Sequence, residues 1–465
     1  MSKHNYSRRK FLGTMPCVAV GTTTLFSSLI NLKAMNNIMA STSMAGGDYK
    51  ALVCVLLSGG NDSFNMIVPR SNAEYNEYAT VRSNQALAQN DLLAINPDSG
   101  DGREYGLHPS LTNMQQMFEA GNLAFVNNIG TLVEPTSKSG VLDSTSNLPL
   151  GLLSHSDQVQ HWQTAFPQDR TNLGWGGKMA DILKSLNDDN GVSMNISLGG
   201  NNVFQRGESI VEYAINNDGG VAIQGWNNPA PFFQLMTEDV TDMMNRQYED
   251  IFKDSYKGVL KRSIESNEVF NSAIDNQTPL LTTFSNNNLS QDLNMVAQSI
   301  KARDQLGAKR QIFFVQLGGF DNHDELINNH GQLMATLDTA FAEFYAATEE
   351  LGVSDCVTTY TISDFARTLT SNGNGTDHAW GGNALVMGGA VKGKQMYGDY
   401  PSLALGNDLE LGGGGVLIPT TSTDSYFAEL AMWFGISPND LSQILPNIGN
   451  FYNVGSGTAP LGFLI

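Results

Sequence analysis

"QIFFVQLGGFDNHDELINNH" (residues 311–330) joins an apolar run to a cluster of acids, amides and imidazoles. Residues 312–317 have the length and the aromatic and β-branched content of a buried strand. Two glycines turn the chain after it, and Asp321 and His323 then follow with a spacing that lets both side chains point the same way. A carboxylate and an imidazole together suit a divalent metal such as Zn²⁺. This stretch therefore predicts a strand whose carboxyl end holds a metal.

Strands and helices alternate on either side of this stretch. Residues 49–62 contain an apolar strand that stops at two glycines, and 108–121 form an amphipathic helix before a strand at 123–127. Residues 330–352 predict a long helix closed by a glycine, and 356–365 predict a further strand. Strands that alternate with helices of this length indicate an α/β fold, with a mostly parallel sheet in a three-layer αβα arrangement.

Residues 205–300 have a different sequence pattern, with helical, methionine-containing stretches and no clear strand signals. We predict a helical insertion, or cap, within a domain that spans 48–465. The glycine-rich segment 383–419 predicts a loop or a tight hairpin.

The N-terminal residues 1–46 contain Arg8 and Arg9 next to Phe11 and Leu12, before a weakly apolar stretch rich in Gly, Thr and Ser. This pattern predicts a twin-arginine export signal, which the twin-arginine translocase would recognise, and hence a periplasmic or secreted protein. The alternative is a chance basic start before a short apolar helix. Because this route carries folded proteins, a metal installed before export is an expected reason for its use.

The composition narrows the classes of partner. A formal charge of −20 disfavours a nucleic-acid partner, since phosphate backbones are bound through Lys and Arg. No interior apolar run of about 18 residues predicts a membrane span. Cys54 and Cys356 lie in apolar strand-like runs, and each is interpreted as a small buried hydrophobe.

Two other strand ends repeat the pattern of the opening stretch. Asp62 follows the first predicted strand and a Gly-Gly turn, where a ligand of a parallel sheet would bind. Its alternative is a helix cap. Asp364 ends a later strand, and after a loop rich in Gly and Asn come Asp377 and His378. That loop could fold back over the strand end, or it could be a solvated surface loop.

A fourth candidate lies at the start of a predicted helix, in "GLLSHSDQVQHWQTA". Ser154, His155 and Ser156 precede or open the helix, where free N–H groups favour an anion. A hydroxyl group there, near a metal, could serve as a nucleophile. The alternative is a capping box, because Ser154 and Asp157 fit the pattern S-x-x-D.

With these motifs, the chain resembles the domain of unknown function 1501 family, within the alkaline-phosphatase-like and sulfatase-like superfamily. The resemblance covers nearly all of the chain after the predicted signal. Its carriers, in chain order, are "SRRKFL", "LLSGGNDSFNMIVP", "LHPSL", "SHSDQ", "GGFDNHDE", "SDFARTL" and "DHAWGGN".

The resemblance implies an alkaline-phosphatase-like fold with one or two divalent metals, Zn²⁺ being the expected ion. By position, Asp62 is similar to the ligand after the first strand, and Asp321 with His323 to an Asp/His pair. Asp364 is similar to the ligand after a later strand, and His378 to a distant histidine ligand.

The resemblance also implies a nucleophile, whereas the substrate-binding candidates come from the residues themselves: Arg367, three residues after Asp364, is the best single candidate for binding an anion, and its alternative is a surface arginine at a helix start. Ser154 lies where the nucleophile would be, with His155 or Ser156 as alternative occupants, so that Ser154 and His155 are the catalytic candidates. The expected substrate-binding residues are Asn61, Ser156 and Arg367.

Two departures from the superfamily pattern stand out. Phe365 follows Asp364 where the superfamily often has a histidine, which would leave one metal short of a ligand. No sulfatase-type Cys-x-Pro-x-Arg motif is present, which disfavours a formylglycine sulfatase.

The leading hypothesis is an exported metal-dependent hydrolase of phosphate or sulfate esters, acting on a small anionic ester or a substrate derived from a polysaccharide. The alternative is a non-catalytic secreted binding or assembly protein that keeps the fold and a structural metal.

Overall fold

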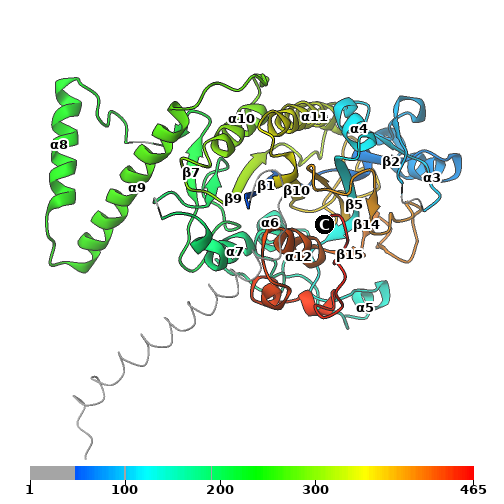
Figure 1. The fold of residues 1–465 in the computed structure, drawn as a ribbon. Coiled ribbons are helices and arrows are strands. Elements are labelled where there is room, and N and C mark those ends of the chain that lie inside the picture. The colour runs from blue at the N-terminus through cyan, green and yellow to red at the C-terminus, as the bar shows by residue number, and fades with distance from the viewer. Residues whose placement is uncertain (1–47, 99–100, 190, 222, 465) are drawn as a thin grey trace, which may run out of the picture.

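The structure, a computed structural model, describes residues 48–98, 101–189, 191–221 and 223–464. The predicted export signal therefore lies outside the described residues. A ten-stranded sheet runs through the body of the protein, in the order β12-β5-β11-β10-β1-β9-β6-β7-β8, with β15 beside β5 (Figure 1). Its strands are β1 (Lys50–Leu57), β5 (Leu123–Gly130), β6 (Asn195–Ser197), β7 (Tyr213–Asn216), β8 (Gly219–Gly220), β9 (Arg310–Leu317), β10 (Val357–Ser363), β11 (Gly382–Met387), β12 (Met396–Tyr397) and β15 (Thr421–Ser422).

The centre of the sheet is parallel. The strands β10, β1, β9, β6 and β7 are neighbours that run in the same direction, and β11 lies antiparallel between β10 and β5. Residues 51–57 of β1 are all buried, as is typical of a parallel strand covered on both faces. The predicted α/β class with a mostly parallel sheet is confirmed. The glycine-rich segment, predicted as a loop or a tight hairpin, ends in the antiparallel hairpin of β13 (Glu410–Leu411) and β14 (Val416–Leu417), and its first residues also contribute most of β11 to this sheet.

Two helical layers cover the two faces of the sheet. Alternate residues of β1 point to opposite faces, so each face presents apolar side chains to one of these layers. Val53 and Val55 pack in one hydrophobic core, whereas Leu52 and Cys54 pack in the other. The burial of Cys54 and Cys356 agrees with their interpretation as apolar residues. The first core contains residues of α4 (Thr112–Glu119), α10 (Asn288–Lys301) and α11 (Leu326–Glu350), and the second contains residues of α6 (His155–Thr164), α7 (Trp175–Leu183), α12 (Thr423–Phe434) and α13 (Leu441–Ile444).

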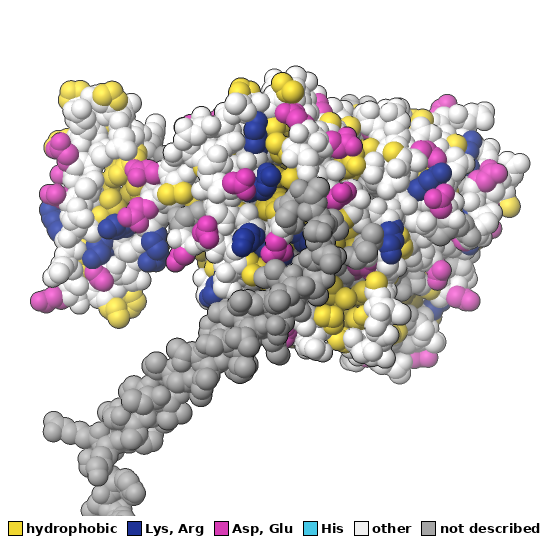
Figure 2. All heavy atoms as spheres, viewed as in Figure 1, with side chains coloured by type: hydrophobic (Ala, Val, Ile, Leu, Met, Phe, Trp, Pro, Cys, Tyr) yellow, Lys and Arg dark blue, Asp and Glu magenta, His cyan; other side chains and the backbone are white. Residues whose placement is uncertain are grey.

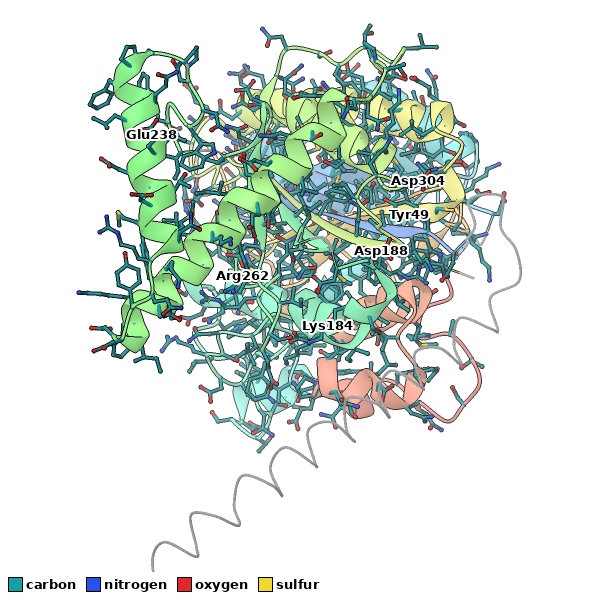
Figure 3. All side chains as sticks on the ribbon, turned by 60° about the vertical axis from the view of Figure 1, so that its left-hand side comes forward. Tyr49, Lys184, Asp188, Glu238, Arg262 and Asp304 are labelled. Carbon is teal, nitrogen blue, oxygen red and sulfur yellow. The ribbon has the colours of Figure 1, made fainter. Side chains whose placement is uncertain are left out.

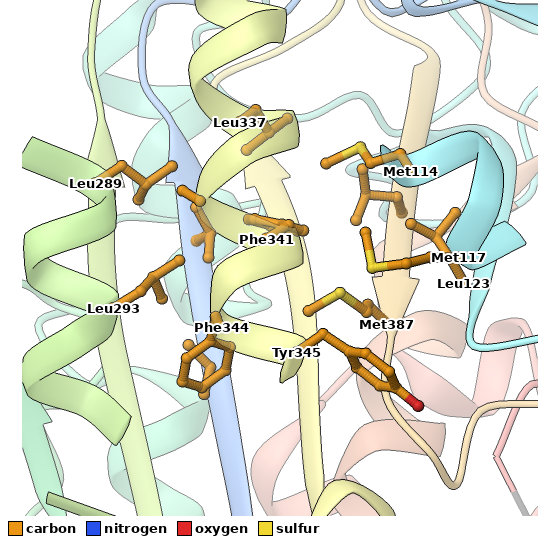
Figure 4. Packing of buried hydrophobic residues seen from close by; sticks show 14 of the residues in the cluster. Met114, Met117, Leu123, Leu289, Leu293, Leu337, Phe341, Phe344, Tyr345 and Met387 are labelled. Atoms are coloured by element: carbon orange, nitrogen blue, oxygen red, sulfur yellow. The ribbon is translucent and has the colours of Figure 1, made fainter. Parts of the chain in front are cut away.

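The long helix α11 lies at the centre of the first layer. Figure 4 shows Phe341 and Phe344 of α11 pointing toward the sheet, with Leu293 of α10 on one side and Met114 and Met117 of α4 on the other. The unbranched methionines fill the space between the larger rings. This packing fixes α11, which begins within the opening stretch of sequence, on this face of the sheet.

The segment 205–300 contains more than the helices predicted for it. It includes the short strands β7 and β8, and most of α10, which is part of the first core. Only α8 (Pro231–Asn245) and the first half of α9 (Ile251–Asp275) stand apart from the body, as a projecting hairpin (Figure 1).

The remaining elements lie around this core, and no helix of the described residues is long and apolar enough to span a membrane. They are the small sheet of β2 (Ile67–Pro69), β4 (Tyr105–Leu107) and β3 (Leu93–Ile95), the hairpin of β13 (Glu410–Leu411) and β14 (Val416–Leu417), and the helices α2 (Ser63–Met66), α3 (Asn72–Arg82) and α5 (Lys138–Leu142).

The substitution Phe341→Ala should test whether this layer is as tightly packed as it appears in Figure 4. The side chain is fully buried, and removing its ring leaves a cavity that costs about 3–5 kcal/mol of the free energy of unfolding. Urea unfolding followed by circular dichroism would measure the loss. The exposed Leu281→Ala is the control and should change stability by less than about 0.5 kcal/mol. Equal stabilities for the two variants would contradict the packing described.

Candidate metal centre

Three neighbouring strands end at one level of the sheet. In the parallel register, Leu57 at the end of β1 lies opposite Leu317 of β9 on one side and Ser363 of β10 on the other. The residues that follow these strands therefore leave the sheet side by side, at the edge where parallel sheets bind their ligands.

The turn after β1 is built to touch the turns after both neighbours. Gly59 has φ +115°, and a Cβ at this position would lie 2.4 Å from the backbone nitrogen of Asp321. Its N–H donates a hydrogen bond to Oδ1 of Asp364 at 3.0 Å. Only glycine allows this backbone conformation and this close approach together.

The loop after β10 returns to the same edge. Ala366 and Ala379 exchange backbone hydrogen bonds with the opposite side of this loop, and Thr368 N–H donates to the carbonyl of Asp377 at 2.9 Å. A bridge between Arg367 and His378 completes the short ladder. The structure thus brings His378 back to the end of β10, and the loop folds over the strand end.

Three imidazoles meet at the carboxylate of Asp321. His155 Nε2 lies 3.4 Å from its Oδ2, while His323 Nε2 lies 3.0 Å and His378 Nε2 3.4 Å from its Oδ1. The Nε2 atoms of His323 and His378 are 3.1 Å apart. His155, Asp321 and His378 each offer a ligand atom within 4.8 Å of the others, which meets the spacing for a metal ion.

Each of these imidazoles is held through its other nitrogen. His155 Nδ1 lies 2.7 Å from Asp364 Oδ2, His323 Nδ1 lies 3.0 Å from Asp377 Oδ1, and His378 Nδ1 lies 2.9 Å from the carbonyl oxygen of Leu153. These partners are acceptors, so each Nδ1 carries the proton and donates it. The lone pair of each neutral ring is then on Nε2, the atom that faces Asp321. Metal-ligating histidines are oriented by such contacts.

In this arrangement, the lone pairs of neighbouring Nε2 atoms face one another with no proton between them. With both Nδ1 atoms protonated, the contact between His323 Nε2 and His378 Nε2 joins two acceptors, and neither can donate to the other. The carboxylate of Asp321 adds a negative charge at the same place. A cation at the centre of the cluster would convert this repulsion into attraction. Burial also lowers the pKa of His378, which keeps its ring neutral and free to act as a ligand.

The distances between neighbouring donor atoms fit a small divalent ion. Zn–N bonds of about 2.0–2.1 Å imply distances of about 3.3 Å between ligand atoms of a tetrahedral site. The four contacts among Asp321 and the three Nε2 atoms range from 3.0 to 3.4 Å. The donor set of imidazoles and a carboxylate is one that Zn²⁺ accepts. The residues present therefore fit a divalent metal.

The cluster is open to solvent on one side. The exposed fractions of the side chains of His155, Asp321, His323 and His378 are 37%, 43%, 44% and 27%. A small ligand can therefore reach the point where the three Nε2 atoms converge.

Asp364, predicted as a metal ligand, has a different position in the structure. Its side chain is buried, Oδ1 accepts from Gly59 and Oδ2 accepts from His155. Since both oxygens face protein donors, Asp364 orients His155 and does not itself face the convergence point. Phe365, at the position where the superfamily often has a histidine, packs against the rings of His155 and His378.

Arg367, predicted to bind substrate, is fully buried. Its Nη1 donates to Asp321 Oδ1 at 2.5 Å, and its Nη2 donates to the carbonyl of Thr376. Burial acts to raise the pKa of Asp321, but the hydrogen bond and the charge of Arg367 hold that pKa below its usual range. Arg367 therefore keeps Asp321 ionised and is shielded from any substrate.

Asp62 and Asn61 also turn away from the cluster. Asp62 forms a buried ion pair with Arg82 and accepts a hydrogen bond from Thr376 Oγ1 at 3.1 Å. Asn61 is buried and accepts from His330 Nε2 at 3.0 Å. The structure thus gives Asp62 the role of a counter-ion and Asn61 that of a packing partner, and brings neither to the metal centre or to solvent.

The hydroxyl groups at the start of α6 lie next to the cluster in sequence. Ser154 occupies the N-cap position, but its side chain makes no capping hydrogen bond, so the predicted capping box does not form. Its Oγ lies 3.2 Å from Oγ of the exposed Ser156. Asp157, the other residue of that motif, binds Arg170 at 2.7 Å, and hydrogen bonds from Arg170 and Ser154 lower its pKa.

Asp377 and the backbone carbonyl of Leu153 were given no role in the site from sequence, and His155 was given a different role. Asp377 orients His323, and its signal was its position directly before His378. His155 was expected to be catalytic, whereas the structure places it among the convergent donors with Asp321 and His378. The backbone carbonyl of Leu153 could not be identified from sequence, because the contact does not depend on the side chain of that residue.

Comparison with known proteins supports the assignment to a family. A family model described as "Protein of unknown function (DUF1501)" matches residues 49–410. A search of curated proteins found no match.

Solved structures with a similar arrangement include a protein in the alkaline phosphatase superfamily from Vibrio parahaemolyticus, with 11% identity, a TM-score of 0.36, and coverage of 87% of this chain and 75% of that chain. PsFucS1 sulfatase from Pseudoalteromonas sp. has 8% identity and a TM-score of 0.31 over 81% and 69% of the two chains. The lipoteichoic acid synthase LtaP from Listeria monocytogenes has 9% identity and a TM-score of 0.27 over 71% of this chain and 61% of its own. Likenesses at this level carry no conclusion about activity.

The roles of His378 and Asp62 can be separated by metal content. We expect His378→Ala to lose the bound metal, because one of the convergent donors is removed, whereas Asp62→Asn should retain it. Asp62→Asn should instead lower the melting temperature, since it leaves the buried Arg82 without its counter-ion. Elemental mass spectrometry on protein purified without chelators would give the metal content. Loss of metal from Asp62→Asn in its folded state would contradict the site described.

Two buried histidines behind the site predict a dependence of stability on pH. Burial lowers the pKa of His330 to about 4 and that of His108 to about 3. In the unfolded chain both take up protons near pH 6.5, so the unfolded state binds more protons between these values. The contribution of these two histidines to the free energy of unfolding is therefore fully present above pH 6.5. It is lost as the pH falls toward 4.

This dependence can be measured by urea unfolding in the presence of a chelator, which removes the effect of metal binding. Replacing one such group, as in His330→Gln, should reduce the slope of the free energy of unfolding between pH 6 and 4.5 by about 1.4 kcal/mol per pH unit. An unchanged slope would show that His330 is protonated in the folded protein.

Proposed function

The chain belongs to the family of proteins of unknown function (DUF1501), and we propose that it is an exported metal-dependent hydrolase of phosphate or sulfate esters. The observation that carries the proposal is the convergence of three imidazole Nε2 atoms on Asp321 at a solvent-accessible strand end. A structural zinc site is closed, whereas a catalytic one leaves room for a further ligand. The exposed side of this cluster provides that room.

The residues around the cluster have distinct parts in the proposal. Three imidazoles and Asp321 would hold a divalent metal, Zn²⁺ being the ion that best suits them. Such an ion supplies Lewis acidity to an ester oxygen. Asp364 and Asp377 fix the rings of His155 and His323, and Arg367 keeps Asp321 ionised.

Ser154 is the proposed nucleophile. It lies between Leu153, whose carbonyl holds His378, and His155, which faces Asp321. Its hydroxyl group is not used to cap α6 and contacts that of Ser156, and in the proposal it attacks the ester held at the cluster. A small anionic ester, or one derived from a polysaccharide, would be bound chiefly through the metal, since Arg367 is buried.

The activity test uses the zinc-loaded protein with p-nitrophenyl phosphate, bis-p-nitrophenyl phosphate and p-nitrophenyl sulfate. We expect turnover of at least one ester and its loss in His155→Ala together with the metal. In Ser154→Ala, kcat should fall roughly 10²-fold or more while the metal is retained. The neighbouring Ser156→Ala is the matched control and should keep most of the activity.

A second candidate function is that of a non-catalytic secreted binding or assembly protein with a structural metal. It is favoured by the number of donors, because His323 lies close to Asp321 and His378 and could add a fourth protein ligand to the group of His155, Asp321 and His378. In that case removing the metal lowers the melting temperature, and none of the three esters is turned over. That result would overturn the hydrolase proposal and leave the metal centre standing.

A further inference from the structure

The hairpin of α8 and α9 projects from the body of the protein and leaves most of its own surface uncovered (Figures 1 and 3). None of the residues of α8 is buried, and the buried residues of α9 all lie in its second half, from Ile264 onward. A helix of 15 residues has little stability of its own in water. A partner surface that covers the apolar side of α8 would therefore stabilise this helix.

Large apolar side chains are exposed along both helices. Phe252 is 84% exposed and Tyr256 68% on α9, and Phe232 is 73% exposed and Leu235 59% on α8. Figure 2 shows hydrophobic side chains at both ends of the hairpin and between its helices. Contiguous apolar surface of this kind marks an interaction site on a soluble protein.

The apolar surface includes a groove of about 510 Å³ near the tip of the hairpin. The methionine and aromatic side chains that line it come from both helices and from the loop between them, and two lysines stand at its rim. The lining includes Met243, Met244, Tyr248, Phe252, Lys253 and Lys257.

The two helices carry opposite charges. α8 contains Glu238, Asp239 and Asp242 and no basic residue. The exposed half of α9 contains an excess of bases over its single acid, Asp254, in a chain whose formal charge is −20. Glu238 on α8 and Arg262 on α9 mark the two helices in Figure 3. The bases of this half are Lys253, Lys257, Lys261 and Arg262.

We propose that the hairpin is a dimer interface, in which α8 of one copy packs on the exposed half of α9 of a second copy. A two-fold axis makes the same contact twice, so that each acidic α8 meets a basic α9 and both apolar surfaces are covered. The chain itself supplies both halves of this complementary pair. This is why a second copy is the occupant that the observations favour.

A membrane surface fits the hairpin less well. The loop at its tip carries the exposed carboxylates of Glu249 and Asp250 beside Ile251 and Phe252. Inserting the apolar residues into a bilayer would bring these charges toward the acyl chains, which is costly. In a dimer the same carboxylates remain in water.

The first test is sedimentation velocity of the full chain over a range of concentrations. We expect a monomer–dimer equilibrium, and Phe252→Asp should raise the dissociation constant at least about tenfold, because it places a charge among the apolar side chains of the interface. Leu281→Asp is the matched control, since Leu281 is 87% exposed but lies outside the hairpin, and it should leave the dimer unchanged.

The second test reverses the charges in separate chains. One chain carries Glu238→Lys, Asp239→Lys and Asp242→Lys on α8, and the other carries Lys253→Glu, Lys257→Glu and Lys261→Glu on α9. Each chain alone should dimerise at least about tenfold more weakly, because α8 then meets an α9 of the same sign. An equimolar mixture should form a heterodimer, in which opposite charges meet again at both contacts.

Three outcomes would overturn the proposal. The first is a wild-type chain that stays monomeric at all concentrations. The second is a dimer that Phe252→Asp leaves intact, or that the mixture of reversed chains fails to restore. The third is a monomer that sediments with vesicles of phosphatidylglycerol and phosphatidylethanolamine in a manner that depends on Phe252, which would assign the hairpin to a membrane surface.

Discussion

The parallel register of β9, β1 and β10 is the constraint on which the candidate site depends. Because Leu57, Leu317 and Ser363 lie side by side, the turns that follow these strands leave the sheet together. Gly59 then allows the first turn to press against Asp321 and to bind Asp364. A shift of any strand by one residue would exchange the faces of its side chains and separate these acids from one another.

The site itself is organised by hydrogen bonds to nitrogen atoms that do not face the centre. Asp364, Asp377 and the carbonyl of Leu153 each take the proton of an imidazole Nδ1, and this choice directs every Nε2 lone pair toward Asp321. Arg367 supplies the positive charge that keeps the buried side of Asp321 ionised. The arrangement accumulates negative charge and lone pairs at one exposed point, which is the property that a cation site requires.

The hairpin of α8 and α9 differs from the rest of the chain in how its large apolar side chains are placed. In the body, methionine and aromatic side chains fill gaps beneath α11, and their position is decided by close packing (Figure 4). In the hairpin, the same residue types are exposed beside the acids of α8 and the bases of α9. The proposed dimer places them in a contact of the kind that the core provides elsewhere.

The sequence by itself predicted the α/β class and several of its elements, because the periodicity of buried strands and amphipathic helices is a local property. It also indicated Asp321, His323 and His378 as members of one site, since each follows a strand end or a Gly-rich loop where ligands gather. The same reasoning placed Asp62 and Asp364 among the ligands and Arg367 beside the substrate. Local sequence shows that a carboxylate follows a strand, but it does not show which donors lie on the other side of it.

Only the tertiary structure decided those roles. Arg82, distant along the chain, pairs with Asp62, and His155 meets Asp364 across the site. Whether Ser154 or His155 faces Asp321 likewise depends on how the start of α6 is set against the ends of β9 and β10. The sequence alone therefore determined which residue types would gather at this edge. Their division into ligands, orienting groups and counter-ions arose from long-range contacts, since the protonation and direction of each side chain depend on its partner in space.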